Sequence, residues 1–168
     1  MRKSLDFLYN SAAALAALFM VGLLVMILLS IVSRQLHFNV PGVDAYAGYL
    51  MAGAGFLALA HTLKRGEHIR VTLILSHLGP AARRWLERWA MGAAAVLAVL
   101  FAVFSVRLVW NSHAFDDIST GNDATALWIP QLAMAVGTVI LAIAAIDEFI
   151  LEWRGRVAPQ HAEALRHE

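Results

Sequence analysis

The sequence predicts an all-α membrane protein with four transmembrane helices. Four stretches without Asp, Glu, Lys or Arg cover residues 11–33, 45–63, 89–106 and 124–146, and each contains 18 to 23 residues. At about 1.5 Å of rise per residue, roughly 20 helical residues cross a hydrocarbon core about 30 Å thick. Of all residues, 60% are hydrophobic and only 15% are charged, which is unlike an ordinary soluble domain.

The basic residues predict the orientation of these helices. Eleven of the 13 Lys and Arg residues lie before the first stretch, between the second and third, or after the fourth. Since positively charged loops stay on the cytoplasmic side, both termini and the middle loop are expected in the cytoplasm. We expect one membrane domain over residues 1–155 and a polar cytoplasmic tail over 156–168. The longest gap, 64–88, leaves no room for a soluble catalytic domain.

The first apolar stretch predicts a helix from Leu8 to Arg34, whose Leu, Val and Ile content suits contact with lipid. The start Met1-Arg2-Lys3 could open a signal peptide. The apolar run is too long for one, however, and no small-residue cleavage site closes it. We therefore expect a retained helix, followed by a short outer turn at 39–42.

The other three stretches contain many small residues, which let membrane helices approach closely. Asp44 opens the second helix, where a carboxylate interacts favourably with the helix dipole, and this helix is expected to pack against protein rather than lipid. Alanines recur every four residues in the third stretch. The pattern predicts a compact bundle or a docking surface for a larger partner. The residues expected at these helix contacts are Gly48, Ala52, Gly55, Ala90, Ala94, Ala98, Ala102 and Gly137.

The segment between the second and third stretches predicts contact with the membrane surface. Its apolar run over 69–78 is too short to span and repeats at helical spacing, which indicates a short amphipathic helix in the cytoplasmic interface. Pro80 then suits the first turn of the next helix. Two tryptophans follow where an aromatic belt belongs, beside arginines that can reach lipid phosphates. The expected interface anchors are Arg83, Arg84, Trp85, Arg88 and Trp89.

The sequence shows no catalytic constellation and no metal site, so we expect no cofactor, no enzymatic activity and no nucleic-acid partner. The absence of cysteine excludes disulfides and thiolate ligands. Only His61 among seven histidines lies inside an apolar stretch, whereas a bis-histidine haem needs facing histidines within the membrane. Because the stretches hold no other ionisable residue, the chain is a poor candidate for a self-sufficient transporter. A transporter subunit is favoured; a cytochrome b-type redox subunit and a membrane-embedded enzyme are the alternatives.

Two polar motifs stand out beside the apolar stretches. The run Lys64–Arg70 is partly explained as a positive-inside loop, but its order indicates a fixed local network after a helix-ending glycine. Its residues of interest are Arg65, Gly66, Glu67, His68 and Arg70. The gap after the third stretch is acidic, with Asp116, Asp117 and Asp123. These carboxylates belong either to a solvated loop or to a docking patch for a protein outside the membrane.

The pattern resembles the small membrane subunit of tripartite ATP-independent periplasmic (TRAP) transporters, the DctQ-type family. The resemblance covers about residues 15–153. It rests on four spans with both ends inside, on a Gly/Ala-rich second helix that ends in the run 55–71 with its Gly-Glu-His-Ile-Arg core, and on the run 125–130 at the start of the fourth helix. Asp44 stands where the family more often has Glu.

The resemblance implies a non-catalytic scaffold subunit of a sodium-driven importer of organic acids, such as carboxylates or sialic-acid-like sugars. It places the chain in the bacterial inner membrane as a multi-pass protein. A large membrane subunit, on a separate chain, would hold the substrate and sodium sites, and a periplasmic binding protein would deliver the solute. No substrate-binding residue is then expected on this chain.

Overall fold

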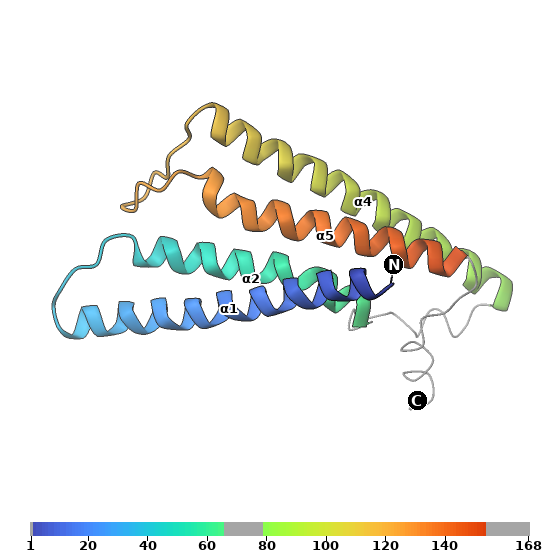
Figure 1. Cartoon of the computed structure of the whole chain (residues 1–168), viewed down its shortest axis with the longest axis horizontal. Coiled ribbons are helices and arrows are strands. Elements are labelled where there is room, and N and C mark those ends of the chain that lie inside the picture. Colours follow the sequence, from blue (N-terminus) through green and yellow to red (C-terminus); the bar gives the residue numbers. More distant parts are fainter. Residues whose placement is uncertain (1, 66–78, 154–168) are drawn as a thin grey trace.

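The computed structural model describes residues 2–65 and 79–153, and this part of the chain is built from four long helices. They are α1 (Arg2–Gln35), α2 (Val43–Arg65), α4 (Pro80–Ala114) and α5 (Trp128–Trp153). All four are long and apolar enough to cross a membrane, which confirms the predicted helical class. The helices form two antiparallel hairpins, α1–α2 and α4–α5, whose connecting loops lie at the same end of the molecule (Figure 1). We call this the loop end and the opposite one the terminal end.

The helices extend beyond the apolar stretches that predicted them. Helix α4 contains 35 residues, although its uncharged stretch spans only 89–106. Gly79 is the extended N-cap residue, and Pro80 follows in the first turn of the helix, as predicted. Proline is tolerated there because the first backbone N–H groups of a helix have no partner within it. A helix of this length, at about 1.5 Å per residue, exceeds a hydrocarbon core. The helix is therefore long enough for its polar turns at both ends to lie outside such a core.

Helix α5 begins later than its apolar stretch suggests, at Trp128 rather than near residue 124. The preceding residues form a folded loop in which Ile118 and Ala126 make an antiparallel bridge. The backbone N–H of Leu127 donates to the carbonyl of Asp117 at 2.9 Å, and Ala124 has a φ of 47°. These loop hydrogen bonds satisfy backbone groups that a longer helix would have used.

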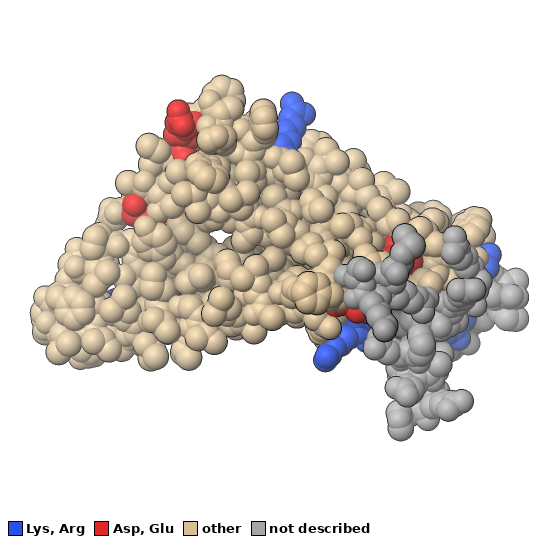
Figure 2. Space-filling model, viewed as in Figure 1, with Lys and Arg blue, Asp and Glu red and all other residues tan. Residues whose placement is uncertain are grey.

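The four helices lie in the order α1–α2–α5–α4 rather than in a closed bundle. Helix α2 packs extensively on α1 and on α5, and α5 packs on α4, whereas α1 barely contacts α5. The outer helices α1 and α4 approach each other at the terminal end and diverge toward the loop end, where the α4–α5 loop lies beside the first hairpin (Figure 1). Figure 2 shows charged side chains near the two ends of the helices and a broad uncharged surface between them. This arrangement leaves extensive apolar faces open to lipid or to a partner.

The interior of the layer is made mainly of small side chains. One cluster joins α1, α2 and α5 through Tyr9, Ala60 and Ala144, and a second joins α4 and α5 through alanines including Ala98 and Ala145. Larger apolar side chains point outward instead, among them many on α1 and α4. Small residues inside and large ones outside bring the backbones close and present apolar surface to the membrane.

Candidate functional site

Helix α2 presents small residues on two opposite faces. Gly53 and Ala54 are buried in the face that contacts α1 and α5. Gly48, Ala52 and Gly55, spaced four and three residues apart, lie on the opposite face and are exposed. A Cβ atom added at Gly48 or Gly55 would meet nothing within 4 Å. We call these three residues the open face of α2.

The other predicted contact residues are also divided between the interior and the surface. Ala98 and Ala102 are buried in the α4–α5 cluster, whereas Ala90 and Ala94 are exposed. Gly137 is buried, and a Cβ atom placed on it would lie 2.5 Å from the backbone oxygen of Phe56. Glycine at this position lets α5 approach the backbone of α2.

A charged cluster joins three helices at the terminal end. The Nζ atom of Lys64 on α2 donates to Oδ2 of Asp147 at 2.5 Å and lies 3.4 Å from Oε1 of Glu148, both on α5. The same ammonium lies 5.2 Å from the ring centroid of Tyr9 on α1. Glu148 is buried, and a buried carboxylate is tolerated when a cation compensates it.

In the sequence, Lys64 opens the basic run 64–70, and no local pattern pairs it with Asp147 or Glu148. A usable signal was present, because the lysine follows the second apolar stretch and the two acids follow the fourth, on the same predicted side of the membrane. Opposite charges at the same ends of neighbouring helices can form an ion pair with each other.

Most of the motif around residues 65–70 lies outside the described part of the chain. Arg65 is the last residue of α2 and is exposed. Gly66, Glu67, His68 and Arg70, like the interfacial helix predicted over 69–78, fall outside the described residues, so these remain predictions.

The loop end is held together by Asp123. Its carboxylate accepts hydrogen bonds from the hydroxyl of Ser119 at 2.8 Å and from that of Tyr49 on α2 at 2.9 Å. The bond from Ser119, with smaller contributions from Thr125 and Tyr49, lowers the pKa of Asp123 to about 2. Asp123 therefore stays ionised and links the α4–α5 loop to the first hairpin.

The three acidic residues of this loop have different environments. Asp116 and Asp117 are exposed, while Asp123 is half-buried. A Cβ atom added at Gly42, which has a φ of 80°, would lie 2.8 Å from Cβ of Asp123. The two hairpin loops thus touch at this aspartate, and its carboxylate has a structural role that the other two lack.

The predicted interface anchors lie along the first turns of α4. Trp85 and Trp89 are exposed, and the guanidinium of Arg88 lies 5.7 Å from the ring centroid of Trp153 on α5. Arg83 pairs with Glu87 at 3.0 Å. The helix also contains Arg84. Exposed tryptophans at a helix end suit the boundary between lipid and water.

The described residues contain no cluster of three or more His, Cys, Asp or Glu that could hold a metal ion. His61 is half-buried on α2. His113 lies against Trp128, with ring centroids 5.2 Å apart.

A comparison with protein families shows which family this chain belongs to. A family model described as "Tripartite ATP-independent periplasmic transporters, DctQ component" matches residues 23–155. The chain belongs to the DctQ family. The match spans the C-terminal part of α1, residues 23–35, and all of α2, α4 and α5, together with the acidic loop and the run 65–70. No curated protein matches this chain.

Membership in the DctQ family makes the chain the small membrane subunit of a TRAP transporter. Members of this family function with a large membrane component and a periplasmic binding protein, and they are generally non-catalytic. The resemblance inferred from the second-helix motif is therefore confirmed. The four apolar helices agree with a multi-pass membrane protein.

Proposed function

We propose that this protein is the scaffold subunit of a sodium-driven TRAP transporter that imports organic acids across the bacterial inner membrane. Both termini and the segment between α2 and α4 lie in the cytoplasm, so the loop end faces the periplasm. The distribution of basic residues supports this orientation. The substrate and sodium sites belong to the large membrane subunit, on a separate chain.

The observation that carries the scaffold proposal is the open face of α2. A helix at the centre of the layer exposes Gly48, Ala52 and Gly55, with no atom within 4 Å of a Cβ added at either glycine. Small residues allow close packing between membrane helices, whereas contact with lipid does not require them. This face therefore suits a helix of the large subunit. The exposed Ala90 and Ala94 extend the same kind of surface on α4.

The loop end supplies a second contact in this proposal. Asp116 and Asp117 are exposed in the periplasmic loop, where complementary charge can steer a binding protein. Asp123 supports the loop that carries them, because its carboxylate is occupied by Tyr49 and Ser119.

The proposal is tested by purifying the tagged protein from native membranes in mild detergent and identifying its partners by mass spectrometry. A stoichiometric, much larger multi-span protein is expected. Gly55→Leu should lower its recovery, since the new side chain occupies the docking face and its Cβ atom meets nothing within 4 Å in this chain. Ala14→Leu, at an exposed position on α1, is the matched control. Purification alone or with a haem protein would overturn the proposal.

A further inference from the structure

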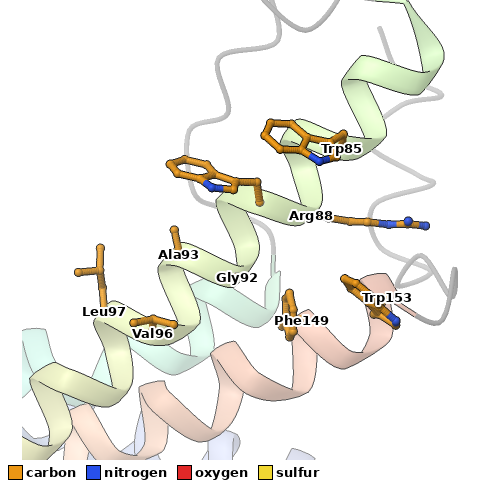
Figure 3. A pocket seen from close by; sticks show the side chains of 9 residues that line it. Trp85, Arg88, Gly92, Ala93, Val96, Leu97, Phe149 and Trp153 are labelled. Carbon is orange, nitrogen blue, oxygen red and sulfur yellow. The ribbon is translucent and has the colours of Figure 1, made fainter.

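A groove of about 680 Å³ lies between α4 and α5 at the terminal end (Figure 3). Trp85 and Trp89 line it from α4, and Phe149 and Trp153 line it from α5. Figure 3 shows Trp85 on α4 and the rings of Phe149 and Trp153 on α5, with the side chain of Arg88 extending from α4 on the side of Trp153. The groove is thus apolar along its length and carries a positive charge on its rim.

The shape of the groove depends on a glycine in α4. A Cβ atom added at Gly92 would lie 3.2 Å from Cε2 of Phe149, which is closer than ordinary van der Waals contact. The absence of a side chain lets the Phe149 ring lie against the backbone of α4. That ring packs at 48° to the ring of Trp153, with centroids 5.9 Å apart, and forms a continuous aromatic wall.

The charge on the rim is uncompensated within the described residues. Arg88 has no carboxylate partner there and its guanidinium lies over the ring of Trp153, whereas Arg83 pairs with Glu87. Trp85, Trp89 and Trp153 are between 61% and 68% exposed. Exposed tryptophans beside an arginine place the rim at the depth of the lipid headgroups, where phosphates are available.

We propose that this groove binds one anionic phospholipid, with the phosphate on Arg88 and an acyl chain along Gly92 and the aromatic wall. A helix of a partner protein would have to bring a carboxylate to Arg88, whereas a lipid already carries its phosphate at this depth. The proposed topology places the lipid in the inner leaflet. The binding chemistry does not depend on that assignment.

Brominated phospholipids test the proposal, because bromine on an acyl chain quenches nearby tryptophans. The chain has five tryptophans, and changing Trp110 and Trp128 to Phe leaves Trp85, Trp89 and Trp153, which all line the groove. This full-length variant is placed in lipid nanodiscs that contain brominated phosphatidylglycerol or brominated phosphatidylcholine. Stronger quenching by phosphatidylglycerol at equal mole fraction supports the site, and equal quenching by the two lipids would overturn it.

An arginine variant tests the headgroup contact in the same background. Arg88→Gln should reduce the preference for phosphatidylglycerol about fivefold, as expected for one basic residue at a membrane surface. Arg107→Gln removes an exposed charge near the loop end of the same helix and should leave the preference unchanged. An unchanged preference in Arg88→Gln would contradict the assignment. If that variant does not fold, the comparison of the two lipids in the variant that keeps only Trp85, Trp89 and Trp153 still tests the proposed lipid site.

The assembled transporter distinguishes a lipid from a protein occupant. A photoreactive phenylalanine analogue at Val96, which lines the groove, should crosslink to a phospholipid in native membranes. The same analogue at the exposed Phe104 is the control for unspecific lipid contact. A crosslink from Val96 to the large subunit would overturn the lipid proposal without affecting the proposed scaffold role. The nanodisc experiment needs no partner, so the two proposals can fail separately.

Discussion

Replacement of Gly137 by alanine should weaken the junction between the two hairpins. The added Cβ atom would lie 2.5 Å from the oxygen and 2.6 Å from the carbon of the Phe56 carbonyl, where ordinary contact begins at 3.4 Å. Backbone atoms cannot rotate away as a side chain can. Helices α2 and α5 must therefore separate by on the order of 1 Å, and close-packed interiors resist such shifts.

The magnitude follows from a comparison with Gly55→Ala. Alanine in place of glycine favours a helix by about 1 kcal/mol in either variant. At Gly55 the new methyl group meets nothing within 4 Å, so this gain stands alone. At Gly137 it is offset by overpacking, which costs about 1–3 kcal/mol. The difference between the two variants isolates the packing cost, so Gly137→Ala should be less stable than Gly55→Ala by about 1–3 kcal/mol.

The assay is a reversible unfolding titration with SDS in mixed micelles, performed on both variants and the wild type. The absence of native cysteine allows a second readout, with spin labels on cysteines introduced at Met51 of α2 and Val136 of α5, both exposed. The mean distance between the labels should increase, or the distribution of distances should broaden, only in Gly137→Ala. Equal stabilities of the two variants, with no change in the distance, would refute the reasoning.

Three further predictions concern charged residues. Lys64→Met should lower the free energy of unfolding by about 2 kcal/mol, because it leaves the buried Glu148 without its cation; adding Glu148→Gln should recover part of the loss in the same SDS titration, and no recovery would argue against the cluster. The pKa of Asp123 is lowered to about 2, so its stabilising bonds are fully present above its unfolded pKa near 3.8 and are lost only as the pH falls toward 2. Asp123→Asn should therefore lower the melting temperature equally at all values between pH 5 and 8, and a difference that shrinks within that interval contradicts the lowered pKa. Changing Asp116 and Asp117 together to Lys should weaken solute uptake without reducing recovery of the large subunit, and unchanged uptake would rule out their role in docking.

The helices themselves were predictable because their signal is local. A run of about 20 uncharged residues must satisfy its backbone hydrogen bonds internally in lipid, which leaves helix as the solution. The start of α4 at Pro80 was predictable for the same reason, since proline fixes its own φ. The start of α5 was not, because it depends on backbone hydrogen bonds across the loop, from Leu127 to Asp117 and from Ser119 to Thr125, which join residues several positions apart in the chain.

Which small residues pack inside the chain could not be read from their spacing. Gly48 and Ala52 have the same spacing of four residues as Ala98 and Ala102, yet the first pair is exposed and the second is buried. Helical spacing places residues on a common face but does not say what covers that face. The same limit explains the hidden role of Asp123, which depends on Tyr49 more than seventy residues away in the chain.

The sequence by itself determined the four helices and the family, because apolar length and the second-helix motif are properties of continuous segments; the side of each loop stays a prediction from charge. Only the tertiary structure decided the order α1–α2–α5–α4, the Lys64 cluster, the open face of α2 and the groove beside Arg88. Each of these depends on the contacts between helices distant in the chain. In a membrane, lipid and protein are similarly apolar, so the hydrophobic pattern does not distinguish the side chains that face a neighbouring helix from those that face lipid.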